Sequence, residues 1–376
     1  MANIYIHIPF CNLKCKYCRF ASFWVLQKKI IEKYIDFLVN EMINFRFKTD
    51  KIDTIYLWWW TPAILDKQDL QKIFYALWKK FCFSDNLEVT IESTASDINK
   101  EKLYTWEKIW INRISIWIQT FNQKSLQEIN RWNKNDFKNC FSALNNYLKF
   151  GKIKNFNFDF IIWLPYVKKW EILNDIKKLI WDFALVKHLS VYMLEDYYNK
   201  DRIIENKFDN IVYPNTWEKL WIAKKDYLWE YVKIKNFLQK KWFSNYEISN
   251  FWKAWYECKH NIWYWTHKET FAFWLSASWL VKQKNDFFRY SNFDNFLDYY
   301  SQKKVTFEKL TKNDIFLEKL IFWIRTKWIS HNLIKNLDQE KLDYFLNNKY
   351  LFLDNNYYRL TNKWILVMDY ILSELI

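Results

Sequence analysis

Glycine is almost absent from this chain of 376 residues, which contains 1 glycine and 4 prolines but 25 tryptophans. Average glycine usage near 7% predicts about 26 glycines at this length, the number that the one glycine and the tryptophans reach together. Glycine is the residue that adopts φ > 0 without steric cost, so tight turns here lack their usual residue. The scarcity indicates that tryptophan occupies many positions where glycine is physically wanted.

Tryptophan occurs at expected turns and close approaches, for example in the run Trp58-Trp59-Trp60 after a strand, at Trp117 and at Trp364. Our hypothesis is that the gene uses UGA for glycine and that the printed sequence translates UGA as tryptophan. The alternative is a protein that is truly rich in tryptophan. Under the hypothesis we interpret most tryptophans as glycines and expect Trp265 to be genuine.

Long apolar runs are also lacking, because none reaches the ~18 residues that span a bilayer. Residues 1–3 lead directly into an expected strand, without the pattern of a secretory signal. Of six cysteines, Cys82, Cys140 and Cys258 are scattered and are expected as buried thiols rather than disulfide partners. These features predict a protein of the reducing cytoplasm.

The net charge is +15, yet no run of five like charges occurs. Lysine, asparagine, isoleucine, phenylalanine and tyrosine are abundant together, as an AT-rich genome would produce. A charge spread over the whole chain is typical of a solvated surface rather than of a nucleic-acid footprint. We therefore expect no nucleic-acid partner.

Three cysteines, Cys11, Cys15 and Cys18, stand in a C-x3-C-x2-C pattern directly after a short apolar run. Three thiolates on one loop can hold three corners of a cube-shaped 4Fe–4S cluster. The fourth iron then lacks a local protein ligand and can accept a small molecule. The alternatives are a structural zinc site or three unrelated cysteines. Zinc usually takes four protein ligands, and His7 is the only spare one nearby.

Strand and helix patterns alternate about six times between residues 5 and 194. This pattern predicts parallel strands joined by crossover helices, either in a doubly wound sheet or in a barrel. In a barrel, functional residues belong at the C-terminal ends of the strands. Polar residues stand there: Thr61 follows the tryptophan run, Glu92 and Gln119 close two later strands, and Asp159 comes late in the next.

The cysteine loop, with Tyr17 before its last cysteine, resembles the radical S-adenosylmethionine (SAM) superfamily. In that superfamily the free iron is chelated by the amino and carboxylate groups of SAM. With the strand-end motifs, nearly the whole chain resembles the oxygen-independent coproporphyrinogen oxidases and their relatives, the heme chaperones of the HemW type. The resemblance implies an α/β fold: an incomplete parallel (β/α)6 barrel with a small C-terminal winged-helix-like module.

The resemblance also implies roles for individual residues. Cys11, Cys15 and Cys18 match the cluster ligands. A second set matches positions that line the cofactor: Tyr5, Trp59 and Trp60 (as glycines), Thr61, Glu92, Gln119, Arg131, Asp159 and Ile161. Restored, residues 58–62 become Gly-Gly-Gly-Thr-Pro, a backbone platform that the methionine amino group of SAM can approach. Arg131 fits as a cation for the carboxylate.

Two features distinguish the branches of this family. The oxidases resemble one another in having a further cysteine two residues after the third cysteine of this loop. At that position, two residues after Cys18, this chain has Phe20. His260-Asn261-x-x-Tyr264-Trp265 is similar to the HNxxYW signature that is associated with heme binding in the chaperones. A histidine nitrogen is a common axial ligand of heme iron. Most lone histidines are structural, and Cys258 is the fallback thiolate ligand.

The expected organisation has three parts: the partial barrel over 1–285, a linker over 286–304 and the C-terminal module over 305–376. In that module, Asn355-Asn356 between two short apolar runs predicts a hairpin. A winged helix can bind DNA, and a DNA-binding regulator is a third functional class. We favour a lid or partner surface, because a fold does not fix a function.

The function that the resemblance implies is heme chaperoning with a 4Fe–4S cluster and SAM. Heme would be handed to apo-proteins such as respiratory enzymes, with transient association with the membrane surface and a homodimer as further expectations. The alternative is the oxygen-independent coproporphyrinogen III oxidase reaction, a radical oxidative decarboxylation.

Overall fold

The computed structural model describes most of the chain. The described residues are 1–11, 13–18, 27–58, 61–131, 134–183, 186–194, 224–275, 277–293, 296–301, 306–326, 329–330, 338–354 and 357–361. In this part of the chain no helix is both long and apolar enough to cross a membrane.

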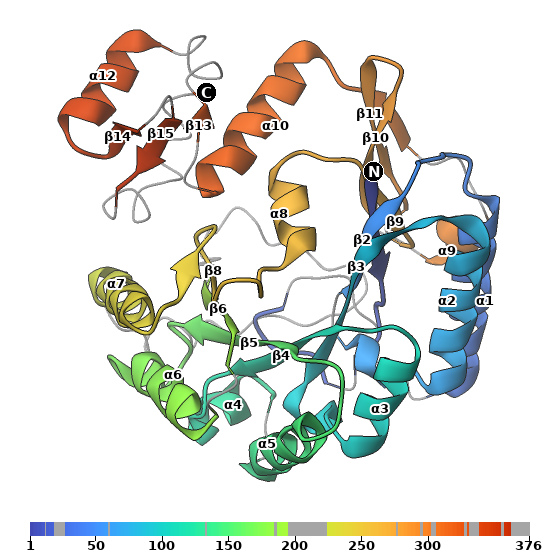
Figure 1. The fold of residues 1–376 in the computed structure, drawn as a ribbon, viewed down its shortest axis with the longest axis horizontal. Helices are drawn as coiled ribbons and strands as arrows, with labels where there is room; N and C mark the ends of the chain where they lie inside the picture. Colours follow the sequence, from blue (N-terminus) through green and yellow to red (C-terminus); the bar gives the residue numbers. More distant parts are fainter. Residues whose placement is uncertain are drawn as a thin grey trace.

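Six parallel strands lie side by side in chain order, and helices connect them (Figure 1). The strands are β1 (Ala2–His7), β2 (Ile52–Trp58), β3 (Phe83–Thr94), β4 (Arg113–Gln119), β5 (Asn155–Ile162) and β6 (His188–Met193). The helices are α1 (Lys28–Asn44), α2 (Lys67–Lys80), α3 (Lys100–Lys108), α4 (Gln123–Glu128), α5 (Lys134–Leu148) and α6 (Glu171–Asp182), with the 3₁₀ turns η1 (Pro62–Ile64) and η2 (Ala95–Asp97). The expected βα alternation is confirmed.

The sheet continues beyond these strands on both sides and stays open, with β12 and β7 as its outermost described strands. β9 (Thr270–Phe273) pairs with β1 in parallel, and β10 (Ser278–Gln283), β11 (Asp286–Ser291) and β12 (Thr306–Lys309) follow in antiparallel order. On the other side, β8 (Asn250–Trp252) and β7 (Ser244–Asn245) extend β6. A long α7 (Lys224–Lys240) precedes β7. The sheet is therefore mostly parallel with antiparallel ends.

Polar and apolar residues alternate along the parallel strands and separate the two faces of the sheet. Ile4 and Ile6 of β1, like Ile114 and Ile116 of β4, belong to the hydrophobic core. The helices α1 to α7 form a layer around the outside (Figure 1), and apolar residues of α1 join the same core. The intervening residues form what we call the polar face: Asn3, Thr54, Tyr56, Glu92, Arg113, Ser115, Asn157, Asp159, His188 and Ser190. A period of two places successive side chains on opposite faces.

The polar face is buried as well, so its polar atoms need partners from within the protein. Thr54 Oγ1 donates to Asn3 Oδ1 at 2.9 Å across β2 and β1. Asn157 Nδ2 donates to Ser115 Oγ and to Ser190 Oγ, both at 2.9 Å, and so joins three strands. A buried polar network of this kind fixes the side chains of a site in place.

Segment 286–291 differs from the expectation of a linker over 286–304. β10 and β11 form a hairpin whose last paired residues are Gln283 and Asp286, with Lys284 at a φ of 55° in the two-residue turn. Lysine carries little sequence signal for a left-handed turn, which is why the hairpin was missed. The sheet therefore runs through the first part of the expected linker, and the division of the chain into three units stays a prediction.

Near the C-terminus, α10 (Lys312–Arg325) and α12 (Gln339–Asn347) accompany a small sheet of β13 (Ile329–Ser330), β15 (Tyr357–Leu360) and β14 (Leu351–Asp354). Asp354 pairs with Tyr357, so the hairpin expected around 355–356 is confirmed by its flanking strands. α9 (Phe296–Tyr300) and α8 (Lys259–Trp265) complete the described helices. Residues 331–337 and 362–376 of the expected C-terminal module lie outside the described residues, and the winged helix stays a prediction.

Candidate functional site

The cysteine loop follows the C-terminal end of β1 and is anchored to the end of α4. The backbone N–H of Lys16 donates to the carbonyl of Ile129 at 3.2 Å, and Lys16 Nζ forms an ion pair with Glu128 at 2.9 Å. Asn130 Nδ2 donates to the Lys14 carbonyl at 3.0 Å. These contacts hold a short loop with no regular structure against the sheet end, where the expected site lies.

All three cysteines of the loop are buried, with 1–4% of their surface exposed, and they pack together with Tyr17. The Cys11 thiol lies 3.5 Å from Thr61 Oγ1, at the end of β2. Within the described residues no three Cys, His, Asp or Glu side chains are arranged around a single metal ion.

The guanidinium of Arg131 faces these thiols. Arg131 Nε donates to Cys15 Sγ at 3.0 Å, and Arg131 Nη2 lies 4.0 Å from Cys11 Sγ. Burial alone lowers the pKa of the guanidinium, but the neighbouring sulfurs of Cys15 and Cys11 outweigh it, and the net shift is upward. Buried thiolates need such a positive partner, because unpaired buried charge is costly. The donor set therefore fits an anionic, thiolate-ligated group.

The side chain of Gln119 contacts the cysteine loop from an irregular, left-handed end of β4. The register of β4 with β5 shifts between Trp117 and Gln119, and Gln119 has a φ of 67°. Its Nε2 donates to Tyr17 Oη at 2.6 Å and lies 3.8 Å from Cys15 Sγ. Strand bulges and left-handed residues cluster at functional sites, where they re-aim a side chain.

The middle of the polar face holds the next predicted residues. Tyr56 Oη donates to Glu92 Oε1 at 3.1 Å, linking β2 to β3. Tyr5 Oη lies 3.0 Å from His7 Nδ1. Burial, and then the Glu92 carboxylate, raise the pKa of Tyr5, so its phenol stays protonated as a donor. These side chains present hydroxyl and carboxylate groups, which suit the polar groups of a nucleoside.

Asp159 accepts hydrogen bonds from two polar neighbours on this face. Its carboxylate accepts from Ser115 Oγ and from Asn157 Nδ2, both at 2.8 Å. Burial raises the pKa of Asp159 although these hydrogen bonds lower it. Ile161, two residues further along β5, is 8% exposed. Asp159 is thus a hydrogen-bond acceptor on β5, the strand that pairs with the strand of Gln119.

The structure therefore brings most of the predicted residues into two adjoining groups. Cys11, Cys15, Cys18, Thr61, Gln119 and Arg131 meet at the strand ends, and Tyr5, Glu92 and Asp159 lie on the polar face. Trp59 and Trp60 lie outside the described residues, as does Phe20.

His260 occupies the opposite end of the polar face. Its Nδ1 lies 2.6 Å from Thr54 Oγ1, and its ring centroid is 5.1 Å from that of Tyr56. Thr54 pairs with Asn3 near the start of β1, whereas the cysteines follow the end of that strand. At 3.3 Å per residue, the four residues from Thr54 to Trp58 span about 13 Å. His260 is thus not brought to the cysteines.

The His260 ring is suited to metal binding in its protonation state. It is 3% exposed, and burial, followed by the charge of Arg113, lowers its pKa to about 3. It is therefore neutral at pH 7, the form of imidazole that binds metals. Because Thr54 engages Nδ1, Nε2 is the nitrogen left for a ligand.

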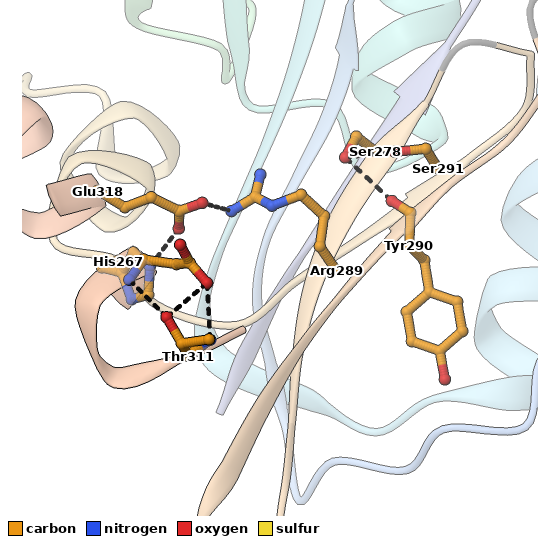
Figure 2. A network of polar contacts seen from close by, with 8 residues as sticks. His267, Ser278, Arg289, Tyr290, Ser291, Thr311 and Glu318 are labelled. Atoms are coloured by element: carbon orange, nitrogen blue, oxygen red, sulfur yellow. Dashed lines mark hydrogen bonds and ion pairs between the residues drawn. The ribbon is translucent and has the colours of Figure 1, made fainter. Parts of the chain in front are cut away.

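The helix that carries His260 also contacts α10. The rings of Tyr264 and Phe322 lie 5.2 Å apart, and the Arg325 guanidinium lies 5.5 Å from the Trp265 ring. Directly after α8, His267 Nε2 lies 2.7 Å from Glu318 Oε2, and Arg289 Nη2 donates to Glu318 Oε1 at 2.6 Å (Figure 2). Tyr264 and Trp265 of the signature thus line the contact with α10.

Sequence reasoning missed Thr54, Tyr56, Ser115 and Arg113 on the polar face. The signal was present as strict alternation, since these residues stand between core positions of β2 and β4. Alternation by itself does not tell a solvated face from a buried one, so their burial could not be foreseen.

Comparisons with known proteins identify the family of the chain. The model of the Radical SAM superfamily matches residues 5–179. The chain is 27% identical over 381 residues to the heme chaperone HemW of Lactococcus lactis, an alignment that covers 96% of this chain and 93% of the relative. It is 30% identical to HemW of Buchnera aphidicola subsp. Schizaphis graminum, covering 75% and 71%, and to HemW of Bacillus subtilis, covering 74% and 70%.

Among solved structures, coproporphyrinogen III oxidase (HemN) from Escherichia coli, described as a radical SAM enzyme, superposes with a TM-score of 0.81. The match covers 99% of this chain and 89% of that chain at 18% identity. Such a likeness establishes the fold: an α/β radical SAM fold like that of HemN, with a mostly parallel sheet.

Proposed function

Because this chain belongs to the HemW family of the radical SAM superfamily, which implies a 4Fe–4S cluster and SAM, we propose that it binds heme and delivers it to apo-proteins. The observation that carries the proposal is the similarity to HemW chaperones over 96% of the chain. The neutral, buried His260 within a matching signature supports it.

The residues at the strand ends fit the two implied cofactors. Cys11, Cys15 and Cys18 would bind three irons of the cluster, and Arg131 would balance their charge and that of a carboxylate. Gln119 would orient the bound group through its amide. When bound, the cluster supplies an electron for reductive chemistry on the sulfonium of SAM. The protein supplies position, charge and exclusion of water.

The heme site that we propose uses His260 Nε2 as an axial ligand. Thr54 would fix the ring through Nδ1, in the manner of the outer partners that orient metal-binding histidines. Cys258 is the fallback, but burial raises the pKa of its thiol, which disfavours the thiolate that iron needs.

The experiment is anaerobic reconstitution of the protein, followed by heme titration of the wild type and of His260→Ala. We expect the substitution to abolish the change in the heme absorption spectrum that accompanies axial ligation. His267→Ala is the matched control, because His267 is equally buried but faces Glu318 and α10. An unchanged heme affinity in His260→Ala would refute the ligand, and a wild type without heme affinity would refute the chaperone function.

The oxidase reaction is the second candidate, since the fold is shared with HemN. It predicts turnover of coproporphyrinogen III under anaerobic reducing conditions. Product formation by the reconstituted wild type would replace our proposal. We expect none, because the chain has Phe20 where the oxidases have their further cysteine.

We also propose that many of the tryptophans are glycines in the native protein. Twelve non-glycine residues of the described chain have positive φ, and six of them are tryptophan: Trp110, Trp163, Trp170, Trp242, Trp255 and Trp274. A bulky side chain rarely adopts this conformation, whereas glycine does so freely. The intact mass of the native protein decides the matter, because each misread position weighs about 129 Da less. A mass that matches 25 tryptophans would refute the proposal.

The partners that we propose are respiratory apo-enzymes reached at the membrane surface, with the chain acting as a homodimer in the reducing cytoplasm. The C-terminal elements from α10 onward, proposed as a winged-helix-like module, would act as a lid or partner surface. The contacts of α10 with Tyr264 and His267 support this role, because they tie the module to the helix of His260. Salt-dependent affinity for duplex DNA in a gel shift would favour the regulator class instead.

A further inference from the structure

Arg113 is a fully buried cation on the polar face, to which no role has been assigned. It is the first residue of β4, where the register pairs it with Thr90 of β3. Only 1% of its surface is exposed. Nε and Nη1 of its guanidinium are both buried without a hydrogen-bond partner in the described part of the chain.

An unpaired buried cation is costly, so proteins retain one where something else compensates it. The Glu88 carboxylate, which helps to raise the pKa of Arg113, is used elsewhere. It accepts from the backbone N–H groups of Lys259 and His260 at 3.0 and 3.1 Å, at the start of α8, and lies 3.6 Å from the Cys258 thiol. Glu88 thus anchors α8 and forms no ion pair with Arg113.

The surroundings of Arg113 keep it charged. Burial lowers the pKa of its guanidinium, but Cys258, Tyr56, Glu88 and Tyr246 together outweigh burial and raise it. Burial raises the pKa of Asp159 and the charge of Arg113 acts to lower it, but that carboxylate accepts its hydrogen bonds from Ser115 and Asn157. Two histidines are further ionisable neighbours on this side. Burial, followed by the charge of Arg113, lowers the pKa of His188 and of His260, so both are neutral at pH 7. The site thus presents a permanent cation with free N–H donors, which is the chemistry that binds a carboxylate.

The position of Arg113 relative to His260 suggests which carboxylate. His260 bonds to Thr54 on β2, and Arg113 stands two strands away on β4. The register places Arg113 level with Tyr56, two residues beyond Thr54 along β2. With neighbouring strands ~4.8 Å apart and a rise of ~3.3 Å per residue, the backbones of Thr54 and Arg113 lie about 12 Å from each other across the face. Heme carries its two propionate carboxylates at the edge of the macrocycle, several ångströms from the iron. We propose that Arg113 binds a heme propionate while His260 binds the iron, an inference that rests on the proposed function.

Heme and its dimethyl ester, which lacks the propionate charge, distinguish this role from a purely structural one. The reconstituted wild type should bind the ester about 10- to 100-fold more weakly than heme, as expected for the loss of a charge-assisted hydrogen bond. Arg113→Gln should lose a similar factor for heme and should no longer discriminate between the two ligands. Arg113→Lys should retain part of the discrimination. Arg46→Gln, at an exposed arginine after α1, should behave as the wild type.

The outcomes separate the two proposals. If the wild type binds heme and its ester equally, or if Arg113→Gln keeps the preference for heme, the inference is wrong while the heme function stands. If the wild type binds neither, the heme function fails and the inference with it. Should Arg113→Gln fail to fold, as judged by loss of iron–sulfur absorption, Arg113→Lys takes its place, and an undiminished preference for heme over the ester in that variant would refute the inference.

Discussion

Trp242 follows the last turn of α7 and has a left-handed backbone, with a φ of 65°. Its N–H donates to the carbonyl of Gln239 at 3.0 Å, and the N–H of Phe243 donates to that of Leu238 at 3.0 Å. This pair of bonds is the Schellman motif, in which the left-handed position is usually glycine. The left-handed conformation costs a residue with a Cβ roughly 1–2 kcal/mol.

The side chain of Trp242 contributes little burial energy to offset this strain, because it is 89% exposed. We therefore expect Trp242→Gly to raise the free energy of unfolding by about 1 kcal/mol, after the loss of a small buried area and the greater freedom of glycine in the unfolded chain. Trp229, 59% exposed in the interior of the same helix, is the matched control. Trp229→Gly should lower the free energy of unfolding by at least about 0.5 kcal/mol, because glycine is a poor helix former.

The assay is urea unfolding of the apo-protein followed by circular dichroism, since tryptophan fluorescence would change with the substitution itself. The two variants should shift the midpoint in opposite directions. A lower midpoint for Trp242→Gly, or an unchanged midpoint in both variants, would refute the strain on which this prediction depends. The same measurement supports or weakens the glycine hypothesis at one position.

Three further predictions concern other parts of the molecule. Cys15→Ser should abolish the iron–sulfur absorption of the reconstituted protein, and a full cluster spectrum in that variant would place the ligands elsewhere. Burial raises the pKa of Glu41 from 4.5 to about 7, so between these pH values the folded chain holds a proton that the unfolded chain releases. The free energy of unfolding should therefore fall as the pH rises from 4.5 to about 7. In Glu41→Gln the urea midpoint should lose this part of its pH dependence. Glu318→Gln weakens the contacts with His267 and Arg289, so amide hydrogen exchange should become faster in α10. Equal exchange rates in variant and wild type would show that these contacts do not stabilise α10.

The cysteine loop and the order of the parallel strands could be predicted because both are encoded locally. The C-x3-C-x2-C spacing places three thiols on one short loop whatever surrounds it, and the packing of Cys11, Cys15 and Cys18 agrees with that. The alternation of strand and helix specifies parallel pairing, since crossovers of this length cannot form hairpins. The strand ends then meet at one edge of the sheet, which brings Gln119 to the cysteine loop.

Only the tertiary structure decided what fills the polar face and where the later signature lies. The His260 motif lies more than 200 residues from Thr54, so its place near the start of the strands depended on how the chain returns after β6. Arg113 stands in an ordinary alternating strand, and nothing local reveals that it is buried without a partner. Burial and pairing arise from strands packed side by side, whereas a sequence pattern records only the neighbours along one strand.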